Sequence, residues 1–395
     1  AERRAKEEQE RNEKDAAARA AAEREAKQKQ DEEKHKKEIE ARSAAQKVAN
    51  EYITAGHERI ARLEAVQAIS HEISDMVDPA VKRLRVDIKK QVRKSGHFGR
   101  GLAASPNNEM SAGACNQISA SPSSIRLVVD KIQALLTNAR NYDEKVFKFA
   151  LDLVAGNLAK QARVILDYQA CYPLAHVISM SCVRTPELTD VVLGYFNRMC
   201  LYTIPQFLKK TQSQPLREYQ LSIGFEVAVG KEDQEEQGEP ELEHVTEYTK
   251  RMTMLTAVLA ATMQTKPWDG SAQPPGLSIG DCWTWLARIA NDEPDLLTGS
   301  LLLTILEVAG FELSQTYKKQ FHKLLVLIAR QVGPRLSKNA RTGAANAAGQ
   351  LEMFITEYEQ RGCRIIEPPA RKLEESKISE ADEEKTDGDR GGGYG

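Results

Sequence analysis

The segment LLTGSLLLTILEVAGFEL, residues 296–313, carries the clearest signal for the fold of this chain. Leucine dominates it, proline is absent, and the apolar residues cover a broad face, which indicates a buried helix. Similar segments, bounded by proline or glycine, follow one another between Leu127 and Arg361. Short helices with broad apolar faces bury those faces against one another in stacked pairs. The sequence therefore predicts an all-α fold.

The helices expected around this segment differ in length and spacing, so the predicted repeat is an irregular, HEAT-like array. The segment LSIGFEVAVG, residues 221–230, alternates apolar and polar residues and favours a short strand or an irregular connection. The expected helices are 125–138, 144–167, one following Pro173, 186–198, 245–262, one containing CWTWLARIAN, one over TYKKQFHKLLVLIARQV, and 342–361.

The two ends of the chain differ in composition from this helical array. Residues 1–50 consist largely of Ala, Glu, Lys, Arg and Gln, which predicts a long charged helix, the end of a coiled-coil region. Two amphipathic helices, Ile60–Ile73 and Val81–Val92, open a domain predicted to span residues 51–367. Within it, residues 96–124 are rich in Gly, Ser, Asn and Pro and predict a flexible loop. Residues 368–395 predict a disordered tail, acidic and then glycine-rich.

Composition excludes several classes of protein. The 395 residues carry a net charge of −2, and no domain is strongly basic, which argues against direct RNA binding as the main role. The six cysteines form no C-x-x-C pair and sit mostly in apolar patterns, as free buried thiols do. No apolar stretch approaches the ~20 residues of a membrane span. We expect a soluble intracellular protein without structural metal, in contact with RNA only indirectly.

Catalytic signatures are absent from the sequence. We find no G-x-S-x-G, H-E-x-x-H, phosphate-binding loop or dinucleotide fingerprint. Acidic pairs such as Glu235–Glu236 fall in a solvated stretch, where nothing raises the pKa of a carboxylate. A constellation assembled only in space would escape this search. The prediction is a protein that is not an enzyme.

Cations recur near the ends and on the faces of the expected helices. Several cations from different helices repel one another unless an anion neutralises them, and Lys and Arg make charge-assisted bonds to phosphate. The alternative is that they are solvated, or paired with glutamates such as Glu144 and Glu187. The candidate ligands of a polyphosphate are Lys90, Arg93, Lys94, Lys160, Arg163 and Arg198.

A series of segments resembles the C-terminal domain of the Gle (GLFG-lethal) family of mRNA export factors. The resemblance covers residues 48–371, and its most specific part is TYKKQFHKLLVLI, with Tyr317, Gln320, Phe321, Lys323 and Leu324 in the family pattern. The matching segments, in order, are FGRGL, LAKQARV, YFNRMCLYTIP, YQLSIGFEV, WTWLARIAN, LEVAGFELSQTYKKQFHKLLVLI and QLEMFITEYEQRG.

The resemblance implies a fold, a function and a location. The fold is a HEAT-like domain similar to the MIF4G-like middle domain of translation initiation scaffolds. The function is to bind a DEAD-box RNA helicase and stimulate its ATPase and RNA-release cycle, with inositol hexakisphosphate as tether. The implied location is the cytoplasmic face of the nuclear pore complex at the nuclear envelope, and the cytoplasm. Other implied partners are the C-terminal segment of an FG-repeat nucleoporin and translation initiation and termination factors, without direct membrane insertion.

The family's inositol phosphate pocket is only partly matched in this sequence. Basic family positions fall on Lys160 and Arg198, whereas two further ones fall on Met199, which cannot bind phosphate, and near Gly156. Lys90, Arg93 and Lys94 retain the basic character of the family's run before the FG dipeptide. Arg163 or His97 would substitute for the missing cations.

Two questions stay open at the level of sequence. The resemblance favours a helicase activator, and the alternative is a non-catalytic scaffold of the nuclear pore or of translation complexes without effect on ATP turnover. The region of Trp283, Trp285 and Phe311–Phe321 is apolar enough for a groove that takes a nucleoporin peptide. At helical spacing, such residues are alternatively part of the core.

Overall fold

The computed structural model describes Glu33, Lys36, Lys47 and residues 50–76, 78–96, 121–165, 167–228, 240–338 and 342–373; the side chains of 80, 93–96 and 342–345 are not described. The chain divides into two units, Ala1–Ala55 and Gly56–Gly395. Most of the predicted charged helix, residues 97–120 of the predicted loop and the predicted tail beyond Leu373 lie outside the described residues. The predicted loop bounds of 96–124 are too wide, because residue 96 ends one helix and residues 122–124 begin the next. The helical array belongs to the second unit.

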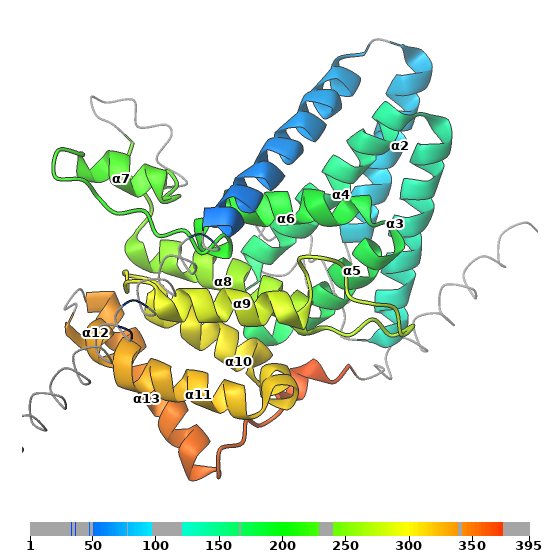
Figure 1. Ribbon diagram of the computed structural model, residues 1–395. Coiled ribbons are helices and arrows are strands. Elements are labelled where there is room, and N and C mark those ends of the chain that lie inside the picture. The colour runs from blue at the N-terminus through cyan, green and yellow to red at the C-terminus, as the bar shows by residue number, and fades with distance from the viewer. Residues whose placement is uncertain are drawn as a thin grey trace, which may run out of the picture. The chain divides into compact units, whose positions relative to one another are not determined.

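The described part of this unit is built from helices, so the predicted all-α fold is confirmed (Figure 1). A helix over 56–75 opens it. The longer elements are α2 Pro79–Gly96, α3 Pro122–Tyr142, α4 Glu144–Val164, α5 Cys171–Arg184, α6 Glu187–Met199, α7 Leu216–Ser222, α8 Val245–Gln264, α9 Ile279–Asn291, α10 Thr298–Tyr317, α11 Lys319–Leu327, a π-helix Ile328–Val332, α12 Gly333–Lys338 and α13 Thr342–Gln360. Short 3₁₀ turns lie at Tyr168–Ala170, Leu201–Thr203 and Pro369–Arg371.

Local sequence explains where several of these helices begin. Asp143 caps α4 by accepting hydrogen bonds from the backbone nitrogens of Lys145 and Val146 at 2.7 and 3.4 Å. Ser278 and Asp281 form a reciprocal capping box at the start of α9. Each such cap stabilises a helix by about 1 kcal/mol, because it satisfies backbone donors that have no partner within the helix.

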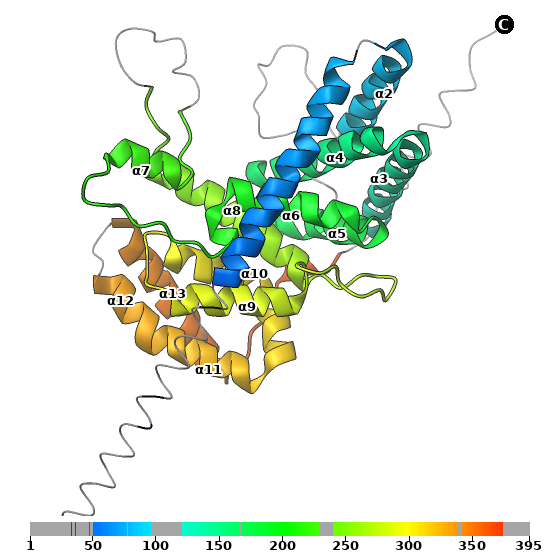
Figure 2. The same ribbon diagram turned by 45° about the horizontal axis from the view of Figure 1, so that its top comes forward.

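Helix α8 lies at the centre of the unit and is buried on nearly all sides. It packs against α4, α5, α9 and α10, and its residues from Met252 to Gln264 are buried. Helices α2, α3 and α4 pack side by side, and α13 packs against α10 and α12 (Figures 1 and 2). Such serial stacking of helices is the repeat-like arrangement that the sequence predicts.

Of the two alternatives for residues 221–230, a short strand or an irregular connection, the described residues 221–228 form the irregular connection. The first part of that segment completes α7, and beyond it Val227 forms one isolated antiparallel bridge with Leu242. A single bridge without further strands cannot build a sheet, and the alternating pattern marks a short irregular excursion. The single helix expected over TYKKQFHKLLVLIARQV is also divided: Lys318, with φ of 45°, separates α10 from α11, and the π-helix follows.

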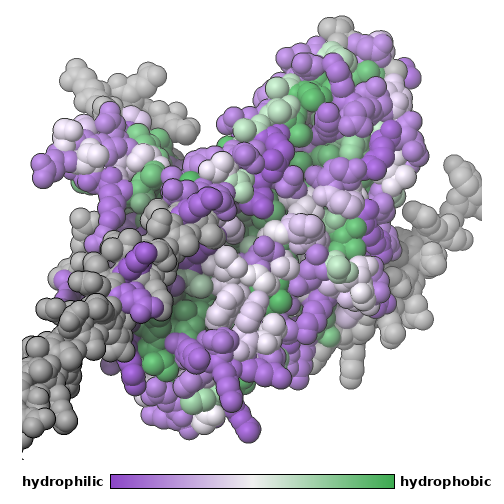
Figure 3. All heavy atoms as spheres, viewed as in Figure 1, coloured by the Kyte–Doolittle hydropathy of each residue, from purple (hydrophilic) through white to green (hydrophobic). Residues whose placement is uncertain are grey.

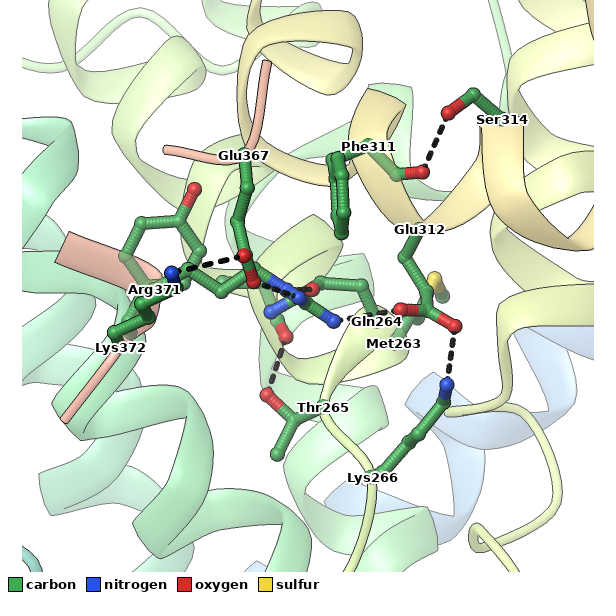
Figure 4. A network of polar contacts seen from close by, with 12 residues as sticks. Met263, Gln264, Thr265, Lys266, Phe311, Glu312, Ser314, Glu367, Arg371 and Lys372 are labelled. Atoms are coloured by element: carbon green, nitrogen blue, oxygen red, sulfur yellow. Dashed lines mark hydrogen bonds and ion pairs between the residues drawn. The ribbon is translucent and has the colours of Figure 1, made fainter. Parts of the chain in front are cut away.

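The segment after α13 returns across α8 and α10 and is fastened by a polar network (Figure 4). Arg371 donates to Glu312 at 2.6 Å and to Gln264 at 2.7 Å, and also binds Glu367. Lys266 Nζ lies 2.6 Å from the other oxygen of Glu312, whose side chain is 5% exposed. Two cations therefore neutralise one buried carboxylate, and residues 368–373, which follow the predicted domain end at 367, stay in contact with the helices.

The face drawn in Figure 3 is largely hydrophilic, with hydrophobic side chains in small groups. Among the described helices, none combines the length and the apolar character needed to cross a membrane.

Candidate anion-binding site

Helices α4 and α6 run side by side in the same direction, which brings their C-terminal ends together. Near their starts, Arg140 at the end of α3 donates to Glu187 of α6 at 2.7 Å. Further along, the Tyr195 hydroxyl of α6 donates to Asp152 of α4 at 2.6 Å. Because the contacts follow the same order along both helices, basic residues near the two ends lie at the same end of the unit.

The C-terminal part of α2 lies against this end of α4. Asn157 Nδ2 of α4 donates to the Val92 carbonyl of α2 at 3.3 Å. Lys160 follows Asn157 by one helical turn, Lys90 precedes Val92 by two residues, and both lysine side chains are exposed. Three helices therefore carry exposed cations near neighbouring C-terminal ends, the third being Arg198 on α6.

Helix α4 thus lies beside both α2 and α6, and an anion site shared by the cations of these three helices stays a prediction. The C-terminal end of a helix carries a partial negative charge, which offsets some of the repulsion among Lys90, Lys160 and Arg198 and leaves an added anion to offset the rest. Arg93 and Lys94 belong to the last turns of α2, and their side chains, like all of His97, lie outside the described part of the structure. The role of these residues as anion ligands stays a prediction.

Arg163 is already neutralised by a carboxylate. Its Nη2 lies 2.5 Å from Glu226 Oε2, and Glu226 Oε1 lies 3.5 Å from Arg251. Arg251 in turn binds Glu243, and both of those side chains are nearly buried. These residues line a cavity of about 510 Å³ whose walls carry both acidic and basic side chains. Arg163 matches the alternative that the cations are partners of glutamates, and it is the weakest of the candidates.

Arg198 is held without being neutralised. Its Nη1 donates to Gln67 Oε1 at 2.6 Å, and its guanidinium carbon lies 5.0 Å from the centroid of the Tyr195 ring. Gly156 makes room for that ring, because a Cβ at 156 would stand 2.9 Å from the Tyr195 hydroxyl. A lysine at position 156 would displace the Tyr195 ring. The family lysine that falls near this position is therefore incompatible with Tyr195 in its present place.

Sequence reasoning missed Gln67, Tyr195 and Glu226. The Tyr195–Arg198 spacing of three residues on one helix is a local signal that could have indicated stacking. Gln67 lies 131 residues before Arg198 and Glu226 lies 63 residues after Arg163, so no local pattern points to either contact.

The two tryptophans of the predicted aromatic groove differ in burial. Trp285 is fully buried and its Nε1 donates to the Tyr202 carbonyl at 2.8 Å, which agrees with the core alternative. Trp283 is half-buried and stacks on Tyr317 with ring centroids 4.3 Å apart. A separate groove of about 370 Å³ lies between the π-helix, α12 and α13 and is lined in part by Ile328, Pro334, Leu351 and Ile355.

The described cysteines are free, and four of them are buried. Burial raises the pKa of Cys182, Cys200 and Cys282 to about 12, so these thiols stay protonated near neutral pH. The expectation of free thiols in apolar surroundings is met by these residues, and Cys363 is the exposed exception. Within the described residues, no group of three His, Cys, Asp or Glu side chains is arranged to hold a metal ion.

Comparison with known proteins gives relatives of one kind. The chain is 27% identical over 306 residues to the mRNA export factor GLE1 of Rattus norvegicus, covering 73% of this chain and 40% of the rat protein. It is 28% identical over 255 residues to the mRNA export factor GLE1 of Mus musculus, covering 60% of this chain and 35% of the mouse protein. The chain therefore spans less than half the length of these relatives.

Solved structures agree in fold. Two complexes of the S. cerevisiae Dbp5 C-terminal domain with Gle1 and IP6 match with TM-scores of 0.63 and 0.61 at 18% and 19% sequence identity. The matches cover 80% of this chain and 96% and 95% of the matched chains. At that identity they establish a common helical architecture. The family model described as GLE1-like protein matches residues 112–329, more than half of the sequence, and the chain therefore belongs to the GLE1-like family.

Proposed function

We propose that this chain is the helical domain through which an mRNA export factor binds a DEAD-box RNA helicase and stimulates its ATPase and RNA-release cycle. The observation that carries the proposal is the likeness to Gle1 in complexes that contain Dbp5 and IP6, which extends over nearly the whole matched chain. In this role the chain is a regulator without catalytic chemistry of its own.

Inositol hexakisphosphate is the proposed tether between the two proteins. The exposed cations Lys90, Lys160 and Arg198 at neighbouring helix ends fit a polyphosphate, because each can donate charge-assisted hydrogen bonds to phosphate oxygens. The sequence adds Arg93 and Lys94 on α2. When bound, the polyanion supplies negative charge that lets this basic surface approach a basic surface of the helicase.

Stimulation then follows from differential binding. A stacked helical unit with a large apolar core is a rigid body, and it favours whichever arrangement of the helicase lobes fits its surface. We propose that this arrangement is the separated one, which releases RNA and restarts the ATPase cycle. The same domain is proposed to bind the C-terminal segment of an FG-repeat nucleoporin at the cytoplasmic face of the nuclear pore, and translation factors in the cytoplasm.

Steady-state ATPase turnover of the helicase, measured with RNA and inositol hexakisphosphate and with or without this chain, tests the proposal. We expect stimulation by the wild-type chain and a several-fold loss in the Lys160→Gln/Arg198→Gln double variant, because two charge-assisted contacts are removed. Lys145→Gln/Lys148→Gln on the opposite end of α4 is the matched control. Turnover that is the same with and without the chain would support the static scaffold instead.

A further inference from the structure

Arg198 is the first member of a chain of hydrogen bonds that ends at a carboxylate on another helix. Arg198 Nη1 donates to Gln67 Oε1 at 2.6 Å, and Gln67 Nε2 donates to the Tyr195 hydroxyl at 2.9 Å. The Tyr195 hydroxyl donates to Asp152 Oδ1 at 2.6 Å. The four residues come from the helix over 56–75, from α6 and from α4, so the chain joins three elements.

We call this series of hydrogen bonds, Arg198–Gln67–Tyr195–Asp152, the relay. In each of its hydrogen bonds only one of the two groups can be the donor. A guanidinium can only donate and a carboxylate can only accept, which fixes the orientation of the Gln67 amide between Arg198 and Tyr195. The Tyr195 hydroxyl donates a hydrogen bond to Asp152, and burial together with that neighbouring carboxylate raises the pKa of Tyr195 to about 12. The phenol therefore keeps its proton at neutral pH and the relay stays intact.

The relay orients Arg198 without cancelling its charge. Only uncharged groups touch the guanidinium in the described contacts: the Gln67 amide at its edge and the Tyr195 ring at its face. Arg163 is the opposite case, because Glu226 binds it directly at 2.5 Å. A guanidinium carries five N–H donors, so the remaining donors of the exposed Arg198 are available to an oxyanion.

We propose that Tyr195 and Gln67 are positioning residues that hold the Arg198 guanidinium ready for a phosphate group. A side chain held in its binding geometry loses fewer rotamers on binding, so the relay favours the bound state. The inference rests on the proposed function for its ligand, but the geometry of Arg198 can be tested without that ligand.

The first test measures the reaction of Arg198 with phenylglyoxal by peptide mass spectrometry in the absence of any anion ligand. We expect Tyr195→Phe and Gln67→Ala to raise the modification rate about three- to tenfold, as the loss of a hydrogen bond frees the guanidinium. Tyr142→Phe, which removes an exposed hydroxyl on α3, is the matched control and leaves the rate unchanged. Unchanged rates in both relay variants would overturn the proposal.

The second test is a double-mutant cycle read by calorimetric titration with inositol hexakisphosphate. Tyr195→Phe should weaken binding about threefold or more when Arg198 is present and have no effect in the Arg198→Gln background. An equal loss in both backgrounds would show that Tyr195 acts through the fold and would overturn the positioning role. If Arg198→Gln alone leaves the affinity unchanged, the ligand assignment in the proposed function fails, and the modification rate still decides the relay.

Discussion

Gly194 determines how closely α6 approaches the helix over residues 56–75. A Cβ at this position would lie 2.9 Å from the Arg59 carbonyl oxygen and 2.9 Å from Leu63 Cβ, closer than atoms normally come. Backbone cannot move aside as a flexible side chain does. The absence of a side chain at Gly194 therefore fixes the spacing that brings Gln67 within reach of Arg198.

We expect Gly194→Ala to lower the free energy of unfolding by about 1–3 kcal/mol through overpacking. Urea denaturation followed by circular dichroism measures the change. Gly349→Ala on α13 is the control, because nothing lies within 4 Å of its Cβ. There we expect stabilisation by about 0.5–1 kcal/mol from the gain in helix propensity. Equal effects of the two substitutions would contradict the close approach.

Glu226 pairs with Arg163 beside the proposed anion-binding site. Glu226→Gln removes the carboxylate bound to Arg163 and should tighten inositol hexakisphosphate binding about two- to fivefold, the strength of an exposed ion pair. Calorimetric titration measures it. Glu247→Gln, an exposed position lining the same cavity, makes the same change in net charge as a control. If both variants tighten binding equally, the effect comes from net charge and not from the release of Arg163.

At the level of elements, the segment after α13 is held in part by one buried carboxylate, that of Glu312. Arg371→Ala leaves Glu312 with Lys266 alone and removes the link to Gln264 (Figure 4). We expect a loss of about 2–4 kcal/mol in the free energy of unfolding, less than for a buried pair with no second cation.

Thermal or urea unfolding tests this loss, with Arg364→Ala, an exposed arginine of the same segment, as control. Limited proteolysis should also cut the Arg371→Ala variant earlier after residue 360, because the segment loses its attachment. A stability equal to that of the control would mean that the network of Figure 4 does not hold the segment.

The elements themselves were largely predictable, since helical periodicity and proline or glycine boundaries are local signals. The helices α3, α4, α6, α8 and α13 appear close to their expected bounds. The same locality explains why the alternation in residues 221–230 left a strand and an irregular connection both open, because the single bridge partner, Leu242, is distant in the sequence. Contacts such as Gln67 with Arg198 need the packed fold, because neither residue has a pattern of its own that points to the other.

At the scale of the whole molecule, the proposed tether is electrostatic whereas the fold is held mainly by apolar packing. Salt shortens the reach of exposed charges from about 10 Å at 0.1 M to about 3 Å at 1 M. Helicase stimulation in the presence of inositol hexakisphosphate should therefore fall several-fold between low and high salt. The melting temperature of the chain, measured by circular dichroism over the same range, should change far less. Stimulation that is insensitive to salt would argue for an apolar joint.

Helix α8 has a consequence for how the unit comes apart. In a simple linear array each pair touches only its neighbours, so one end can unzip while the other stays folded. Here the central helix α8 packs against α4 and α5 and also against α9 and α10. Neither the helices before α8 nor those after it can unfold alone without exposing the apolar surface of α8. We therefore expect the two sets of helices to unfold together. A force applied to α4 or α5 is thereby borne by α9 and α10 as well.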